Sequence, residues 1–499
     1  MYTLKRMMTL KTSENKLLVD SKQFQQQLAE DLGANSDLIT RVFTIDEKSE
    51  LVIAYIESIC DIHVIQSAIV KPINELFEHS SVENLKQHHE LVQHLRNYSL
   101  SAARIQTIDS WTGVLDALVS GNTVIFVPKS PEVIVVGTKS IESRSVTEPT
   151  TQVLVRGPKD GFTEMLQTNI ALIRSRIQSS KLKVELSKLG TTTQTDIAVM
   201  YIDGVVDQSI LESVKKKLAD IKIDGVLESR YLESFLEGEE YSPFPLTCTT
   251  ERPDVIVGNL LEGRIVVLIN GTPFAIILPT LFMDFFKTAE DYYEKADISS
   301  MVRLIRIFAF VLSLVTPGLY VALVTHHIGM IPTGLAISIA AQREGVPFPT
   351  IVEIFLLDIT FEILREAGIR IPRASGQAAS IVGALIIGQG VVEAGFVSAI
   401  STIIVALTAI SSFAVPQYDI GGSARVLRFV MLVMGAFIGL YGIILTLFVI
   451  VFHLAKLSSF GVPYFSPISP FNAAAQQDNF IRLPWKMMKR KRNVVRDKK

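Results

Sequence analysis

Residues 304–324 read LIRIFAFVLSLVTPGLYVALV, an apolar run of about 21 residues with Arg303 and Arg306 at its start. At 1.5 Å per residue a helix of this length is about 30 Å long, which is the thickness of the hydrocarbon core of a bilayer. Long basic side chains at such a position can reach the lipid headgroups. The run therefore predicts a membrane-spanning helix that follows a more polar first part of the chain.

Two further apolar stretches extend the predicted membrane domain to residues 298–456. Residues 426–454 have Arg425 and Arg428 at their entrance and His453 near their end, and we expect one tilted span there. Residues 378–415 carry Glu393 as their one charge, which makes this residue a possible intramembrane polar site. We expect two spans in this stretch, at 378–393 and 394–415. Four crossings in all would leave both ends of the chain on the same side.

Residues 328–341 and 350–367 are harder to assign to a bilayer. The first stretch is apolar but short, which is typical of a re-entrant or broken helix. The second is long enough for a helix yet rich in charge, and its acidic side chains are the pore-lining candidates: Glu353, Asp358, Glu362 and Glu366. Because the last three repeat every four residues, they form one stripe on a helix.

Three interpretations of this stripe remain open, because a carboxylate at mid-membrane costs roughly 2.5 to 3.5 kcal/mol or more. The helix can lie at the interface as an amphipathic helix, paired to Arg365, Arg370 and Arg373. It can line a pore in which several copies place their carboxylates in rings that select cations. It can also form the coupling site of a transporter.

The first 295 or so residues indicate an α/β fold with an internal repeat. VIAYIESICDIHVI at 52–65 lies over AVMYIDGVVDQSIL at 198–211, and ALVSGNTVIFV at 117–127 lies over NLLEGRIVVLI at 259–269. In each copy β-branched runs flank a turn and predict a hairpin, at 122–136 and at 264–278 across Asn270 and Gly271. We therefore expect two similar α/β subdomains.

The predicted organisation follows from these patterns, and its divisions are a variable N-terminal segment 1–35, subdomain 36–141, connecting helix segment 142–189, subdomain 190–297, membrane domain 298–456 and basic tail 457–499. Within the connecting segment, Arg174 and Arg176 lie on a helix expected at 163–178. They are expected at a solvated or subunit-facing edge. With Arg365 they are candidates for oligomer contacts or for coupling.

Composition and motifs exclude several classes of function. The net charge of -2 gives no global basic field for nucleic acid, and neither the two cysteines nor the eight histidines form a metal-ligand or catalytic pattern. We therefore expect no enzyme activity, cofactor or metal. The N-terminus has no secretory signal, and eight basic residues from Lys486 onward place the C-terminus in the cytoplasm by the positive-inside rule. The basic tail can also bind anionic membrane lipid.

Four blocks carry a resemblance to a known family: RGPKDGFTEMLQTNIALIRSRI, QREGVPFPTIVEIFLLDITFEILREAGIRIP, GQAASIVGALIIGQGVVEAG and FGVPYFSPISP. They resemble, in the same order, the signature blocks of the A subunits of bacterial spore germinant receptors, and the similarity covers about residues 36–470. The resemblance implies a multi-pass protein of the spore inner membrane with both termini on the cytoplasmic, spore core side.

The resemblance further implies a partnership with a transporter-like B subunit and a lipoprotein C subunit in a complex that senses nutrients. It implies self-association as a pentamer whose A subunits form a ligand-gated channel for monovalent cations. One alternative is the stage V sporulation protein of the same superfamily, an accessory ion-release channel. A secondary transporter is another, although it would show inverted repeats in the membrane part.

Overall fold

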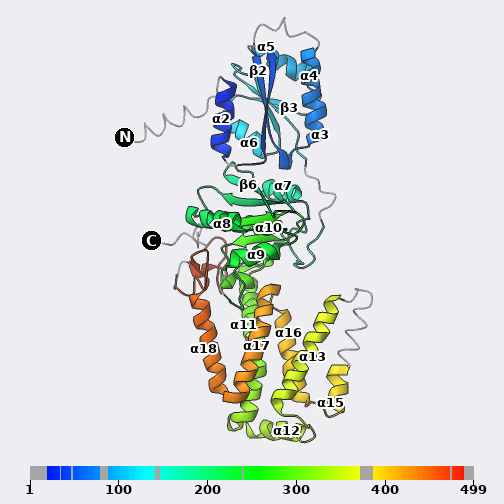
Figure 1. Cartoon of the computed structure of the whole chain (residues 1–499), viewed down its shortest axis with the longest axis vertical. Coiled ribbons are helices and arrows are strands. Elements are labelled where there is room, and N and C mark those ends of the chain that lie inside the picture. Colours follow the sequence, from blue (N-terminus) through cyan, green and yellow to red (C-terminus); the bar gives the residue numbers. More distant parts are fainter. Residues whose placement is uncertain are drawn as a thin grey trace, which may run out of the picture.

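Figure 1 shows the computed structural model of the chain, which describes residues 20–33, 35–46, 49–78, 88–140, 147–238, 241–370, 386–472 and 475–487. Two α/β units follow one another along the long axis, and a bundle of helices forms the other end of the molecule. Residues outside these ranges include Arg373 and 378–385, the first half of the span predicted at 378–393. That part of the prediction lies outside the described residues.

The first unit is a five-stranded sheet in the order β1-β2-β4-β5-β3, with every neighbouring pair antiparallel. One face is covered by α2 and α6, and the other by the helices between β2 and β3. The elements are α2 (Ser21–Leu32), β1 (Leu38–Asp46), β2 (Ser49–Ile56), η1 (Glu57–Ile59), α3 (Ile62–Ile65), η2 (Gln66–Val70), α4 (Lys71–Glu78), α5 (His88–His94), η4 (Leu95–Ser99), β3 (Ile105–Ile108), α6 (Trp111–Val119), β4 (Thr123–Phe126) and β5 (Val133–Val136).

The second unit repeats this plan with the order β6-β7-β9-β10-β8, again all antiparallel. Helices α8 and α9 cover one face, and α7 and α10 cover the other. The elements are α7 (Leu166–Arg176), β6 (Leu182–Leu189), β7 (Thr195–Ile202), α8 (Gln208–Asp220), α9 (Ser229–Glu237), β8 (Cys248–Thr250), α10 (Pro253–Leu261), β9 (Ile265–Ile269) and β10 (Ala275–Leu278).

The α/β fold with two similar subdomains is confirmed by these sheets. The repeated sequences occupy equivalent strands, since 52–56 lies in β2 and 198–202 in β7, the second strand of each order. Both predicted hairpins form, as the pairs β4 with β5 and β9 with β10. Gly271 takes a φ of 95° in the second turn, which its lack of a Cβ permits.

Two predicted boundaries are corrected by the packing. Helix α2 lies inside the segment 1–35 that was set apart as variable, yet Phe24 is fully buried against the first sheet and stacks on Phe126 with ring centroids 4.2 Å apart. Strand β6 lies inside the predicted connecting segment 142–189 but pairs with β7. Both elements were left outside their subdomains because an amphipathic helix and a polar edge strand give weak hydropathy signals.

The helical part begins with α11 (Ala296–His326), which leaves the second unit and runs the length of the bundle (Figure 1). The remaining helices are η7 (Ile328–Met330), α12 (Thr333–Arg343), α13 (Thr350–Arg370), η8 (Ile386–Gly390), α15 (Val391–Glu393), α16 (Ala399–Phe413), α17 (Tyr418–Ile438) and α18 (Leu440–Lys456). Among the described residues α11 and α17 are long and apolar enough to cross a membrane. They approach closely where Gly318 faces Gly435, since an added Cβ on Gly318 would lie 2.6 Å from the Met431 carbonyl oxygen.

The single span predicted at 426–454 is wrong, because the chain turns back at Gly439 and forms the two helices α17 and α18. Gly439 has a φ of 71°, and a Cβ there would lie 2.6 Å from the His327 ring. Hydropathy does not detect this turn because both flanks are apolar. The broken helix predicted at 328–341 corresponds to η7 and α12, and α12 lies across the end of the bundle (Figure 1).

The chain then returns to the second α/β unit after α18. The elements after α18 are β11 (Ser458–Ser459), β12 (Val462–Pro463) and η9 (Ala475–Gln477). They follow in sequence long after η5 (Phe282–Phe286) and η6 (Ala289–Tyr292), which connect β10 to α11. Tyr464 is fully buried in a cluster with Phe282 and Phe285. The start of α11 and the end of α18 therefore both lie beside the α/β part.

Replacement of Phe24 by alanine tests whether α2 belongs to the first unit. Loss of a fully buried phenylalanine costs about 3 to 5 kcal/mol of unfolding free energy. We expect the α/β part of the full-length Phe24→Ala protein to unfold at a clearly lower temperature than that of the wild type. Circular dichroism of the protein in detergent measures this thermal unfolding. Gln23→Ala on the exposed side of the same helix should change little, and equal effects of the two changes would remove α2 from the core.

Candidate functional site

Helix α13 turns its charged side toward the other helices and its apolar side outward. Glu353 and Asp358 are fully buried, whereas Phe355 is 42% and Ile363 64% exposed. In Figure 1 α13 is aligned with α16 and α17 within the bundle, in contrast to α12. Buried charge with exposed apolar residues fits a helix whose outer side faces hydrocarbon or another subunit better than one lying at the interface.

Arg428 of α17 holds two carboxylates of the predicted stripe. Its Nε lies 3.3 Å from Oδ2 of Asp358, and its Nη2 donates a 2.9 Å hydrogen bond to Oε1 of Glu362. Both Arg428 and Asp358 are buried, and within the described part of the chain neither Asp358 oxygen has a hydrogen-bond partner. The ion pair is thus the interaction that compensates the Asp358 charge.

Glu362 is the centre of this cluster, which we call the α13–α17 charge cluster: Asp358, Glu362, Arg365, Arg425 and Arg428. Oε2 of Glu362 lies 3.2 Å from Arg365 and 3.5 Å from Arg425, in addition to the bond from Arg428. Two carboxylates face three guanidinium groups, which leaves an excess of one positive charge. In this arrangement the stripe does not present free negative charge to a cation.

Glu353 forms a second buried site one to two turns nearer to α12. Its Oε2 accepts hydrogen bonds from the hydroxyls of Ser398, at 3.0 Å, and of Ser401. Ser398 is also the N-cap of α16, so the carboxylate lies at the positive end of that helix. Arg343 of α12 approaches Oε1 at 3.6 Å. Glu353 therefore ties α13 to both α12 and α16.

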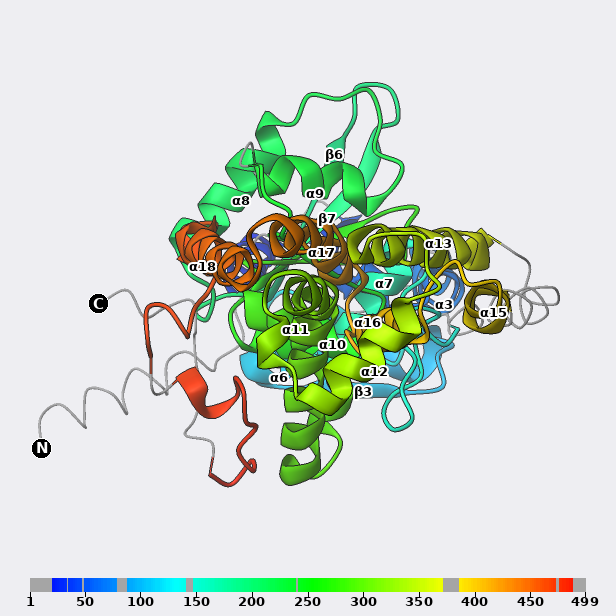
Figure 2. The same ribbon diagram turned by 90° about the horizontal axis from the view of Figure 1, so that it is seen from below.

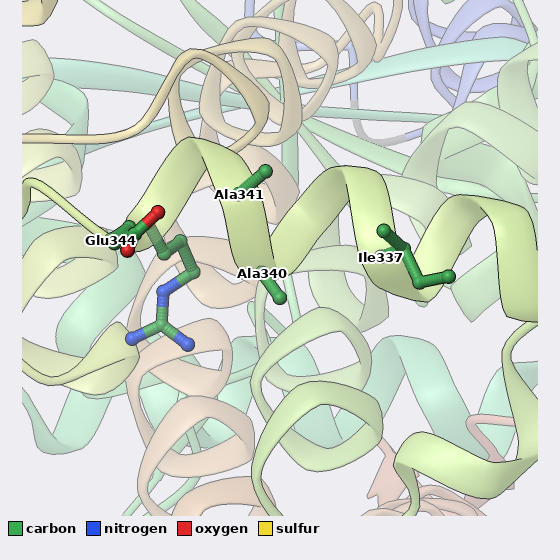
Figure 3. A pocket seen from close by; sticks show the side chains of 5 residues that line it. Ile337, Ala340, Ala341 and Glu344 are labelled. Carbon is green, nitrogen blue, oxygen red and sulfur yellow. The ribbon is translucent and has the colours of Figure 1, made fainter.

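A shallow, open pocket lies along α12 at the far end of the bundle, and Figure 3 shows its lining residues. They are Ile337, Ala340, Ala341, Arg343 and Glu344. The pocket combines one large and two small apolar side chains with one residue of each charge. Since Arg343 is already paired with Glu353, the pocket adds little independent binding capacity.

The other candidates on the helical part are on its surface. Glu366 pairs with Arg370 at 2.7 Å, and both side chains are more than half exposed. Glu393 of α15 accepts a hydrogen bond of 2.7 Å from Gln389 and is exposed. Neither residue joins the α13–α17 charge cluster.

Arg174 does not lie at a solvated or subunit-facing edge, as the sequence suggested, because it is 2% exposed and bound within the chain. Its Nε and Nη2 donate to the two oxygens of Asp37 at 2.8 and 2.7 Å, and Nη2 also reaches Asn35. Asp37 precedes β1 of the first sheet, whereas Arg174 is on α7 of the second. Arg174 thus couples the two α/β units, and Arg176 binds Asp160 at 2.7 Å nearby.

The junction between the α/β part and α11 is a network of buried charges. Arg303, which the sequence assigned to lipid headgroups, is fully buried and binds Asp291 at 3.0 Å and Asp478 at 2.9 Å. Burial alone would raise the pKa of the nearby Asp284 carboxyl. Arg264, at 2.6 Å, and the neighbouring Lys287 outweigh this and hold the pKa well below its usual range.

Sequence reasoning found the carboxylates and two of their partners, since Arg365 pairs with Glu362 and Arg370 with Glu366. It missed the partners on other helices, which are Arg343, Ser398, Ser401, Arg425 and Arg428. One signal was available, because Arg425 and Arg428 are three residues apart and so share a helix face, as Asp358 and Glu362 do at four. No group of His, Cys, Asp and Glu side chains suited to a metal ion lies within the described ranges.

Comparison with known proteins identifies the family of this chain. Residues 26–494 match the family described as Bacillus/Clostridium GerA spore germination protein. This chain belongs to the GerA family of spore germination proteins.

Individual relatives cover nearly the whole chain. Spore germination protein KA of Bacillus subtilis (strain 168) is 45% identical over 91% of this chain and 83% of its own length. The uncharacterized membrane protein YfkQ of the same organism is 40% identical over 91% of this chain and 87% of its own. The crystal structure of the N-terminal domain of the A subunit of the Bacillus megaterium spore germinant receptor GerK3 aligns at 30% identity and a TM-score of 0.41, over 54% of this chain and 97% of that one.

Removal of Arg428 tests whether the charge cluster stabilises the bundle. Breaking a buried ion pair from one side costs about 3 to 5 kcal/mol, because a buried charge is left uncompensated. We expect Arg428→Met to lower the unfolding free energy of the full-length protein by this order in mixed-micelle denaturation. Asp358→Asn in the same chain should recover part of the loss, since the two changes remove one interaction.

The matched control is Arg370→Met, which breaks the exposed pair with Glu366 and should cost about 0 to 1 kcal/mol. An Arg428→Met protein as stable as the Arg370→Met protein would contradict a stabilising role for the cluster.

Proposed function

We propose that this chain is the A subunit of a spore nutrient germinant receptor and that its helical part forms a ligand-gated path for monovalent cations. The family match over residues 26–494 supports the receptor role. The names of the relatives describe spore germination and membrane proteins rather than enzymes. In this proposal the A subunit works with a transporter-like B subunit and a lipoprotein C subunit and assembles as a pentamer.

The surface of the bundle supports its placement as a multi-pass domain in the spore inner membrane. Large apolar side chains face outward on successive helices, among them Phe308 of α11 at 64%, Phe437 of α17 at 76% and Phe448 of α18 at 69%. A soluble protein would bury many of these side chains. Because α11 starts and α18 ends beside the α/β part, both termini lie on one side, which the basic tail assigns to the cytoplasm.

The α13–α17 charge cluster is the observation that carries the channel proposal. Carboxylates within an apolar-surfaced bundle are costly unless they are paired or serve an ion path. Here they are paired with the arginines of α17, so the described arrangement corresponds to a closed state. Opening requires α13 to move away from α17, which exposes Asp358 and Glu362 to cations.

Cation flux through the reconstituted receptor complex tests this proposal. The path would lose its cation sites in the double variant Asp358→Asn with Glu362→Gln. We expect nutrient-triggered potassium flux in proteoliposomes to fall about tenfold or more, since 1.4 kcal/mol of lost ion stabilisation corresponds to a factor of ten. In the double variant the buried Arg428 guanidinium has lost both carboxylate partners. Adding Arg428→Gln removes this unpaired charge, and the flux should stay low.

The single variant Arg428→Gln should act in the opposite direction and raise flux without nutrient, because it weakens the closed state. Asp196→Asn removes an exposed carboxylate from the α/β part. It should change neither the nutrient-triggered flux nor the flux without nutrient. Wild-type flux and selectivity in an assembled complex carrying the double variant would contradict a role of these carboxylates in the path.

A further inference from the structure

Residues 475–487, which we call the tail segment, lie against the first turns of α11 at the boundary between the α/β part and the bundle (Figure 1). Figure 2, viewed from below, shows the tail segment beside the bundle and outside it. Trp485 is 64% exposed, and Ile481 and Met487 are also exposed. These apolar side chains face solvent on the surface of the segment.

Polar contacts fix the tail segment to α11. Ser300 Oγ accepts a 3.0 Å hydrogen bond from the Arg482 backbone nitrogen and donates to the Arg482 carbonyl. Arg482 also donates to the carbonyl of Glu294 at 2.9 Å, and Asp478 pairs with Arg303. These contacts fix the position of the tail segment along the axis of α11.

If α11 crosses a membrane, the tail segment lies at the level of the lipid headgroups. The 31 residues of α11 extend about 46 Å at 1.5 Å each, whereas the hydrocarbon core is about 30 Å thick. Counted back from His326, about 20 residues fill the core and end near Ile307. Ser300 and Arg303 lie one to two turns beyond, at the level of the headgroups.

The side chains of the tail segment have the chemistry of a membrane interface. The Arg482 guanidinium lies 5.4 Å from the centre of the Trp485 ring and 5.5 Å from that of Tyr292. Tryptophan and tyrosine with cations beside them are characteristic of the headgroup layer, where one end of the ring is apolar and the other polar. Met301 of α11 is also exposed.

The basic residues near the C-terminus favour an anionic membrane surface. From Lys486 to the C-terminus the sequence has eight basic side chains and one acidic side chain, Asp497, although the whole chain has a net charge of -2. Each basic residue near an anionic leaflet contributes an attraction that adds to the others. A nucleic acid would also match the charge, and its bases stack on tryptophan, but it would leave the exposed Ile481 and Met487 side chains without an apolar partner.

We infer that the tail segment binds anionic phospholipid headgroups through Lys486, with Trp485 inserted at the cytoplasmic interface beside α11. This inference rests on the proposed function only in requiring that α11 cross the membrane. It assigns Trp485 and Lys486 to lipid binding and Arg482 to positioning the Trp485 ring. It also places a lipid contact directly on the Arg303 network that joins α11 to the α/β part.

Tryptophan fluorescence of the full-length protein tests this inference, because Trp111 and Trp485 are the two tryptophans of the chain. In the Trp111→Phe protein Trp485 is the sole reporter. We expect brominated acyl chains to quench its emission in phosphatidylcholine vesicles that contain phosphatidylglycerol, and high salt to weaken the effect. If Trp111→Phe lowers the yield of folded protein, the difference between the wild-type and Trp485→Phe spectra isolates the same signal.

Charge neutralisation supplies the specificity test. Lys486→Gln should reduce the preference of the tail for phosphatidylglycerol roughly fivefold, as expected for the loss of one basic residue near the surface. Lys188→Gln, an exposed site in the α/β part, is the matched control and should leave the preference unchanged. Equal quenching with and without phosphatidylglycerol would overturn the assignment to anionic lipid.

A second reporter separates this inference from the proposed membrane topology. Phe308→Trp, placed in a chain with Trp111→Phe and Trp485→Phe, must be quenched by brominated lipid if α11 spans the bilayer. Quenching at position 308 without quenching of Trp485 overturns the lipid site alone, whereas no quenching at either position overturns the topology as well. A Trp485 signal that responds to added RNA or to protein concentration, but not to lipid, also overturns the lipid site.

Discussion

A charged side chain that leaves water must meet an opposite charge, and this constraint determines how the parts of this chain are joined. Arg174 joins the two sheets through Asp37, and Arg303 joins α11 to the α/β part through Asp291 and Asp478. Arg428 joins α13 to α17 through Asp358 and Glu362. Apart from the pair of Arg303 with Asp291, these pairs link elements that are far apart in the sequence. Breaking any of them from one side would leave a buried charge unpaired.

The same constraint explains which features could be predicted from the sequence. The two subdomains, both hairpins and the polar stripe of α13 depend on local periodicity and turn residues, and the sequence displays these directly. The turn at Gly439 and the partners of the stripe depend on which helices become neighbours. Arg428 was assigned to a span entrance and Arg174 to a surface because the sequence does not show which carboxylate lies beside an arginine after folding.

The pairing also gives the helical part a physical basis for two states. In the described arrangement three guanidinium groups face two carboxylates, so the cluster repels cations rather than attracting them. A modest separation of α13 from α17 would reverse the sign of the charge presented by α13. Arg303 binds both Asp291 near the α/β part and Asp478 of the tail segment, so a movement of either segment would displace the start of α11. Further along the same helix, Gly318 packs against α17.

The distance between α13 and α17 tests the central claim most directly. Spin labels at Ile363→Cys and Val426→Cys would lie on exposed sides of the two helices, away from the paired charges. The native Cys60 and Cys248 are buried, and burial raises the pKa of the Cys60 thiol to about 11, so neither competes well for the label. In the reconstituted receptor complex, a mixture of amino acids, sugars and nucleosides that triggers cation flux should lengthen the 363–426 distance. An unchanged distance distribution in vesicles that conduct cations would contradict the account.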